Sequence, residues 1–277
     1  MIARELLQAA KLKLEQAGCD SPSIDAEALL LHTWEISKTE LIIKMNDDVP
    51  VDVALAFSEF LDRRTAREPL AYIVGVKAFW MHDFVVTPDV LIPRPETEHL
   101  IEKVLQYYPN QSETIAFCDI GTGSGCIAVT LADLYTQAFV TACDISSESL
   151  LIAKRNADNM GVSKRMTFYQ GDLYLALAEN SKFDVIVSNP PYVSKEEMKV
   201  LEAELDFEPR QALTDEASGL TLLAMLLEDA HLYLKDEGLL ALESGLCGMP
   251  ATPETLLKLE DYFDLAGNFR GSVFRKA

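Results

Sequence analysis

The sequence predicts a doubly wound α/β fold, in which helices cover both faces of a parallel sheet, preceded by a small all-helical domain and a β-hairpin linker. After about Ser112, apolar segments of strand length alternate with helical segments, a pattern typical of parallel sheets. Before Pro69, the chain shows only short segments with helical spacing of apolar residues. We therefore expect a helical domain over residues 1–70, a linker over 71–95 and an α/β domain over 96–277.

Four helices are expected in the first domain. Helix-breaking or capping residues separate them: Gly18 ends the first, Ser23 or Asp25 opens the second, and Ser37 or Thr39 opens the third. The fourth runs from about Val53 to Arg67. No catalytic constellation is visible here, so we expect a role in recognition or support.

The linker is expected to be a hairpin, with strands at Ala71–Gly75 and Phe84–Val86. A helix should begin near Pro95, since proline favours the first helical position. In the α/β domain the expected strands are 115–120, 139–144, 166–170, 183–188 and 239–243, and the expected helices are 127–135, 147–160 and 220–234.

Composition narrows the functional classes. The formal net charge is -20, which disfavours a nucleic-acid substrate because phosphate contacts need basic patches. No apolar run approaches the roughly 20 residues that cross a bilayer, and the amino terminus lacks a signal-peptide pattern. The five cysteines form no CxxC pair, as expected of reduced thiols in the cytoplasm. The four histidines lack metal-ligand spacing, so no metal is expected.

A glycine loop predicts a cofactor site. The loop Gly121-Thr-Gly-Ser-Gly125 joins a predicted strand to a predicted helix, and glycine lets the backbone approach a ligand closely. Asp144 follows at the end of the next strand, where it suits the two hydroxyls of a ribose. Asp172 and Leu173 follow the third strand and suit an adenine amino group and ring. A nicotinamide or flavin is the rival ligand, but the GxGxG spacing and the lack of GxGxxG favour S-adenosylmethionine.

A second motif predicts the substrate. Asn189-Pro-Pro-Tyr192 ends a buried strand, and the two prolines make this loop rigid. The Asn189 side-chain oxygen and the Pro190 carbonyl can accept both N–H bonds of a planar amino group. Tyr192 can stack on the plane. Methyl transfer to such a nitrogen depends mainly on positioning. We therefore assign catalysis to Asn189, Pro190 and Tyr192, and substrate binding to these residues with Pro191.

Longer motifs resemble the HemK-type glutamine N5-methyltransferases that modify peptide chain release factors. They include Arg67–Gly75, Val90–Glu98, Asp119–Ile127, Val187–Tyr192 and Phe207–Pro209. The resemblance implies a Rossmann-like class I methyltransferase sheet, an N-terminal recognition domain and S-adenosyl-L-methionine as cofactor. It implies that Gly121 to Gly125, Asp144, Leu173 and Asn189 line the cofactor site. It also implies that Asn189 to Tyr192 hold the glutamine of a Gly-Gly-Gln loop, with Thr97 and Glu98 near the methyl group.

Two segments depart from the family pattern. The segment Glu243–Met249 lacks the usual glutamine, and Gly267–Arg270 differs from the usual Asp-x-Arg. We expect both to lie away from the cofactor and amide motifs. Arg94, between two prolines, is expected to pair with a carboxylate.

The expected partner is a class 1 release factor, bound by a monomer without direct nucleic-acid contact and away from membranes. Three alternatives remain open: a ribosomal protein glutamine as substrate, a nucleic-acid base methylated at adenine N6 or guanine N2, and a binding module without activity. A base-specific enzyme should show a basic face and room for a flipped base. A binding module should have lost Asn189, Pro190 or Asp144, and all three are present.

Overall fold

A computed structural model describes residues 1–200 and 202–277, which pack into two compact units. The smaller unit contains Met1–Val76 together with Glu202–Phe207. The larger contains residues 77–200 and 208–277. Within the described residues, no helix combines the length and apolar character needed to span a bilayer.

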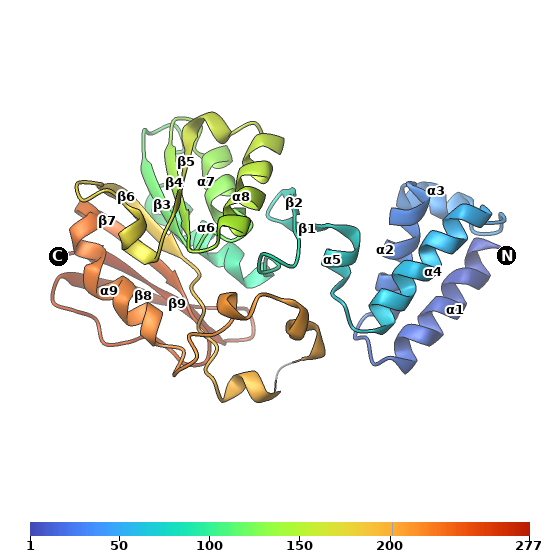
Figure 1. Ribbon diagram of the computed structural model, residues 1–277. Coiled ribbons are helices and arrows are strands. Elements are labelled where there is room, and N and C mark those ends of the chain that lie inside the picture. Colours follow the sequence, from blue (N-terminus) through green and yellow to red (C-terminus); the bar gives the residue numbers. More distant parts are fainter. Residues whose placement is uncertain (201) are drawn as a thin grey trace. The chain divides into compact units, whose positions relative to one another are not determined.

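The smaller unit is helical, as the sequence predicts (Figure 1). Its helices are α1 (Ala3–Gln16), α2 (Pro22–Trp34), α3 (Lys38–Ile43), α4 (Val51–Thr65) and α5 (Leu70–Val74). Ser37 caps α3 in a reciprocal arrangement, because its hydroxyl accepts from the Glu40 amide while the Glu40 carboxylate accepts from the Ser37 amide. Buried side chains of the helices, including Leu14, Leu29 and Phe57, form its core.

The prediction of a strand at Ala71–Gly75 is wrong, since residues 71–74 belong to α5 and Gly75 is its C-cap. A short apolar run does not distinguish a strand from a buried helical turn. Here Pro69 precedes the helix, and Gly75 ends it with a left-handed φ of 77°. The hairpin itself exists and is formed by β1 (Val76–Phe79) and β2 (His82–Val85).

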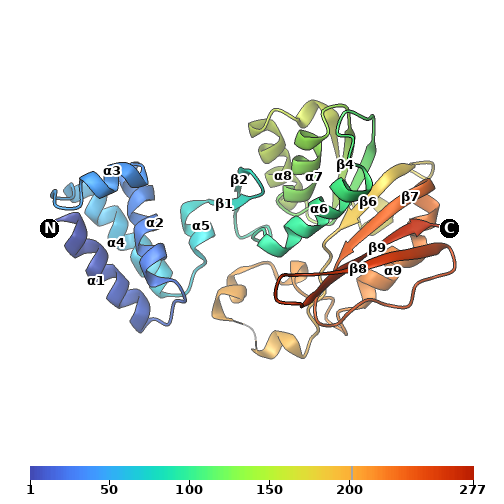
Figure 2. The same ribbon diagram turned by 180° about the vertical axis from the view of Figure 1, so that it is seen from behind.

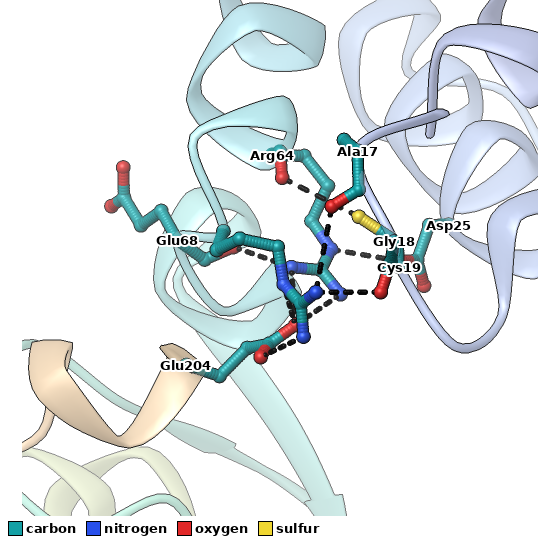
Figure 3. Close-up of polar contacts among 8 residues, drawn as sticks. Ala17, Gly18, Cys19, Asp25, Arg64, Glu68 and Glu204 are labelled. Atoms are coloured by element: carbon teal, nitrogen blue, oxygen red, sulfur yellow. Dashed lines mark hydrogen bonds and ion pairs between the residues drawn. The ribbon is translucent and has the colours of Figure 1, made fainter. Parts of the chain in front are cut away.

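A cluster of charges holds the segment Glu202–Phe207 in the smaller unit (Figure 3). Arg64 donates to Asp25 at 2.8 Å and to Glu204 at 3.1 Å. Arg67 donates to the same Glu204 carboxylate through Nε at 2.7 Å. Arg64 is buried, with 6% of its surface exposed, so these carboxylates supply the partners that a desolvated guanidinium requires.

The larger unit contains a seven-stranded sheet in the order β5-β4-β3-β6-β7-β9-β8. The strands from β5 to β7 are parallel neighbours, which confirms the predicted parallel sheet. Their bounds are β3 (Ala116–Ile120), β4 (Phe139–Asp144), β5 (Met166–Gln170), β6 (Phe183–Ser188) and β7 (Leu234–Glu243).

Helices cover both faces of this sheet, which confirms the doubly wound fold (Figure 1). On one face, α6 (Glu98–Tyr107), α7 (Cys126–Leu134) and α8 (Ser147–Asn159) pack on residues such as Phe117 and Val185. On the other face, α9 (Thr221–Tyr233) packs on residues such as Ile186 and Leu240. Alternate residues of each strand therefore enter separate cores. Within the described residues, six short 3-10 helices lie in connecting segments: Pro95–Thr97, Ser163–Arg165, Leu173–Ala176, Glu197–Val200, Ala203–Phe207 and Arg210–Ala212.

Two antiparallel strands extend the sheet beyond the prediction. They are β8 (Leu256–Phe263) and β9 (Phe269–Lys276), and β9 lies between β7 and β8 (Figure 2). Gly271 permits this packing, because a Cβ there would lie 2.0 Å from the Leu242 carbonyl oxygen. The sequence analysis predicts no strand in these two segments, so this antiparallel edge adds to the predicted sheet.

Candidate functional site

A cavity of about 340 Å³ opens at the carboxyl ends of the parallel strands. Its lining includes Gly121 after β3, Asp144 at the end of β4, Gly171 after β5 and Asn189 after β6. The chain order of the strands reverses between β3 and β6. In doubly wound sheets, ligands bind at the point where the strand order reverses. The topology and the cavity therefore indicate the same site.

The glycine loop is shaped by left-handed backbone at Gly121, Gly123 and Gly125, with φ values of 73°, 55° and 80°. The amides of Gly121 and Thr122 both donate to the Cys143 carbonyl at 2.9 Å, which fixes the loop against β4. Gly125 has a further constraint, because a Cβ there would lie 3.0 Å from the Ala153 Cβ. The loop is therefore close-packed on α8 and leaves its opposite side to the cavity.

Asp144 lies beside this loop and faces the cavity. Its carboxylate accepts from the amides of Gly123 and Ser146, at 2.8 Å and 2.9 Å. Burial raises the pKa of Asp144 above its usual value, although these backbone amides oppose the shift. Asp144 thus has a defined orientation at the position where the sequence predicts a ribose contact.

Apolar side chains form the rest of the cavity wall. Ile145 is 57% exposed, although it is a large aliphatic residue, and it lines the cavity together with Leu91 and Leu173. Leu173 has a φ of 45°, a conformation that is costly for a residue other than glycine and that is often found at ligand sites. Aliphatic walls beside Asp144 and Asp172 fit the adenosine of S-adenosylmethionine, which presents an apolar ring and a pair of hydroxyls.

The Asn-Pro-Pro-Tyr loop meets the cavity through Asn189 and Pro191. Asn189 Nδ2 donates to Thr97 Oγ1 at 3.0 Å. Within the described residues, no donor bonds the Asn189 Oδ1 or the Pro190 carbonyl. Two acceptors of adjacent residues are therefore available for a planar amino group, and their contact with a substrate amide stays a prediction.

Tyr192 does not line the main cavity. Its hydroxyl donates to Glu243 Oε1 at 3.1 Å, and its ring packs against Gly245, where a Cβ would lie 2.9 Å from the ring. The expectation that the segment Glu243–Met249 lies away from the amide motif is wrong, because Glu243 contacts Tyr192 directly. Stacking of Tyr192 on the substrate stays a prediction.

The twelve predicted site residues divide into three groups. Seven of them line the main cavity: Gly121, Gly123, Asp144, Asp172, Leu173, Asn189 and Pro191. Thr122 and Ser124 are buried and border a smaller cavity of about 40 Å³, together with Thr97 and Asn189. Gly125, Pro190 and Tyr192 are not among the residues that line either of these two cavities.

Of the two residues that the resemblance places near the methyl group, Thr97 borders the smaller cavity. Glu98 instead accepts from the Trp80 amide at 2.7 Å, which ties the hairpin turn to α6. Arg94 pairs with Glu208 at 2.5 Å, and this confirms its expected carboxylate partner. Glu208 also accepts from the Ile92 amide at 3.0 Å.

Sequence reasoning missed two buried carboxyls near the site. Asp119 accepts from the Thr122 hydroxyl at 2.7 Å and from the Ala128 amide at 3.2 Å, and burial raises its pKa to about 7. Glu243 is fully buried at the end of β7. An acidic residue at the last or next-to-last position of an apolar strand was the available signal for both.

Two protein-family models match parts of the chain. Residues 5–75 match the PrmC N-terminal domain, and residues 97–218 match the methyltransferase small domain. The first match covers the helical unit, and the second covers the glycine loop, Asp144 and the Asn-Pro-Pro-Tyr loop.

Curated relatives are similar over most of their length. A release factor glutamine methyltransferase of Nitratidesulfovibrio vulgaris is 41% identical over 241 residues, or 87% of this chain and 81% of that relative. One of Bacillus subtilis is 39% identical over 261 residues, or 92% and 88%. Among solved structures, the hMettl16 catalytic domain in complex with an RNA hairpin has a TM-score of 0.54 at 16% identity. It covers 70% of this chain and 74% of that one, and this likeness shows the fold alone.

Proposed function

Because the chain belongs to the release factor glutamine methyltransferase family, we propose that it methylates the side-chain amide N5 of a glutamine in a class 1 peptide chain release factor. The methyl donor is S-adenosylmethionine, and the target is the glutamine of the Gly-Gly-Gln loop. One observation supports this most strongly: Asn189, whose Oδ1 is bonded by no donor of the described residues, lines a cavity that fits the methyl donor. The Pro190 carbonyl, which follows directly in the chain, is likewise bonded by no donor of the described residues.

The donor site is built by the strand ends. When bound, S-adenosylmethionine supplies an electrophilic methyl group on a sulfonium. Asp144, with its carboxylate fixed by two backbone amides, would hold the ribose hydroxyls. Ile145 and Leu173 would contact the adenine faces, and Asp172 would accept from its amino group. Gly121 to Gly125 would lie along the methionine part, close to the backbone of the loop.

The acceptor site is built by the loop after β6. An amide nitrogen is a weak nucleophile, since its lone pair is delocalised into the carbonyl. Asn189 Oδ1 and the Pro190 carbonyl would each accept one of its two N–H bonds, which fixes the plane of the amide. The lone pair then points out of that plane towards the methyl group. Positioning of this kind lowers the barrier without a strong base.

In the methyl transfer, one bond forms at the nitrogen and one bond breaks at the sulfur. The nitrogen forms a bond to the methyl carbon while the bond from sulfur to that carbon breaks, and the sulfur keeps the electron pair. The nitrogen then loses one of its protons to solvent, since it has gained positive charge. Pro191 and its rigid neighbour keep the loop in place during these changes.

We further propose that the helical unit recognises the release factor and that the enzyme works as a monomer in the cytoplasm, without binding nucleic acid. The charge of -20 supports a protein substrate. All five cysteines are free thiols, which fits a reducing compartment.

The experiment uses labelled S-adenosylmethionine and a purified release factor, with the same factor carrying alanine at the loop glutamine as control. The proposal expects label on the first and none on the second. Equal label on both would refute the glutamine assignment. Stronger label on a ribosomal protein, transfer RNA or DNA would redirect it to another substrate class.

A further inference from the structure

A buried chain of polar groups lies behind the acceptor loop. Asn189 Nδ2 donates to Thr97 Oγ1 at 3.0 Å. The Thr97 hydroxyl also lies close enough to the Glu243 carboxyl to oppose the rise of its pKa, and that carboxyl accepts from the Tyr192 hydroxyl at 3.1 Å. Thr97 is 2% exposed and Glu243 is 0% exposed. The chain thus connects a cavity residue to a carboxylate that solvent does not reach.

The buried carboxylate of Glu243 lacks part of the hydrogen bonding that would compensate for its removal from water. Its Oε2 has no hydrogen-bond partner within the described residues, and an unpaired buried carboxylate oxygen is costly. Burial raises the pKa of Glu243 to about 7, while Thr97, Tyr192 and Arg270 favour its ionised form and Glu96 opposes it. Tyr262 and Cys126 are the other titratable groups that interact with this carboxyl.

The direction of the chain follows from the number of protons. A hydroxyl has one proton to donate. If Thr97 donates it to the Glu243 carboxylate, Thr97 can only accept from Asn189. The Asn189 amide must then present Nδ2 to Thr97, and its Oδ1 faces the substrate.

We propose that Glu243 and Thr97 are positioning residues that fix which end of the Asn189 amide faces the substrate. This inference rests on the proposed function, because it concerns the glutamine NH2 group that Asn189 would hold. The ionised carboxylate orders Thr97, and Thr97 orders Asn189. Neither residue touches the reacting atoms.

The arrangement makes methyl transfer dependent on pH. When Glu243 binds a proton, Thr97 is released from donating to it and can donate to Asn189 Oδ1. The Asn189 amide then turns and presents its own NH2 group to the substrate NH2 group. Turnover should therefore be full above the pKa of Glu243 and should fall as the pH drops through about 7.

The first test compares Thr97→Val with Thr97→Ser. Valine keeps the shape and removes the hydroxyl, whereas serine keeps the hydroxyl. Thr97→Val should lower kcat by about 10- to 100-fold, the scale of a misplaced reacting group. Thr97→Ser should retain most of the activity. The KM for the release factor and the Kd for S-adenosylmethionine should change little in both variants.

The second test is the pH profile of Glu243→Gln at saturating S-adenosylmethionine. The neutral side chain cannot titrate, so the acid limb of kcat should disappear between about pH 6 and about pH 8.5. Saturation matters because Asp119, beside the glycine loop, also has a pKa raised to about 7. A melting curve would show whether Thr97→Val folds. If it does not fold, the pH profile of Glu243→Gln still tests the positioning inference.

The outcomes separate the two proposals. If the native enzyme leaves the release factor glutamine unmethylated, the proposed function fails. If the native enzyme methylates it but Thr97→Val keeps the native kcat, or Glu243→Gln keeps the acid limb, only the positioning inference is overturned. An equal loss in Thr97→Ser and Thr97→Val would likewise overturn it, since the hydroxyl would not be the group that matters.

Discussion

Asn189 is the residue on which the acceptor site depends most. Its replacement by alanine removes a side-chain oxygen while leaving the Pro190 carbonyl in place. We expect kcat to fall by about 100-fold or more, the usual cost of removing a preorganised polar group. The Kd for S-adenosylmethionine should rise only modestly, because Asp144 and the glycine loop are unchanged. Asn159, exposed at the end of α8, provides a control, and Asn159→Ala should be neutral.

Gly125 tests the packing of the glycine loop. In Gly125→Ala the new methyl group would need a left-handed conformation and would overlap Ala153. Gly161 also has a positive φ, of 71°, but a Cβ at that position would meet no atom within 4 Å. Gly161→Ala should therefore cost only the conformational term, about 1 kcal/mol, and Gly125→Ala more. Equal denaturant midpoints would show that the contact with Ala153 is relaxed without cost.

At the scale of residues, the sequence was informative where function depends on local order. Asp144 ends one strand and Asn189 directly follows another, and this position alone predicts that they share an edge of the sheet. Thr97 and Glu243 form a network with partners 92 and 51 positions away in the chain. No local pattern encodes such a pairing, so their roles needed the structure.

At the scale of elements, strands 139–144, 166–170 and 183–188 were predicted with the bounds that the structure shows. Their apolar runs end at polar residues that cannot extend a buried strand. The two antiparallel strands β8 and β9 were missed because charged residues interrupt them, as in Lys258, Glu260 and Asp261. An edge strand tolerates such residues, since one side faces solvent.

The segment Glu202–Phe207 offers a test of element packing. Glu204→Ala removes the carboxylate that Arg64 and Arg67 share. Because Arg64 is buried, we expect a loss of about 1–3 kcal/mol of stability in the helical unit. Trp34 lies in α2, so its fluorescence in a Trp80→Phe background reports this unit.

Its control is Glu196→Ala, which removes a carboxylate that is 79% exposed and paired with Lys199. Exposed pairs contribute little, so this variant should unfold at nearly the native denaturant concentration. If Glu204→Ala behaves like the control, the cluster does not stabilise the helical unit.

For the whole molecule, the buried carboxyl of Glu243 links folding to pH. Its pKa is raised from 4.5 to about 7 in the folded state. The folded state therefore binds the proton more tightly than the unfolded state, and this group makes the protein more stable as the pH falls from about 7 towards 4.5. Above about 7 the contribution is constant and unfavourable.

Glu243→Gln removes this contribution. The melting temperature of the variant minus that of the native protein should be higher at about pH 8 than at about pH 5. The difference between the two conditions cancels the effect of lost shape or hydrogen bonding, which is the same at both. A difference of zero would mean that the carboxyl is not desolvated as the structure indicates.

The central claim is that the loop after β6 grips a glutamine amide beside the methyl donor. The most direct measurement is a crystal structure with S-adenosylhomocysteine and a Gly-Gly-Gln peptide. We expect the ribose at Asp144, the sulfur next to Asn189, and the glutamine nitrogen bonded to both Asn189 Oδ1 and the Pro190 carbonyl. A sulfur atom far from Asn189, or a glutamine bound elsewhere, would contradict it.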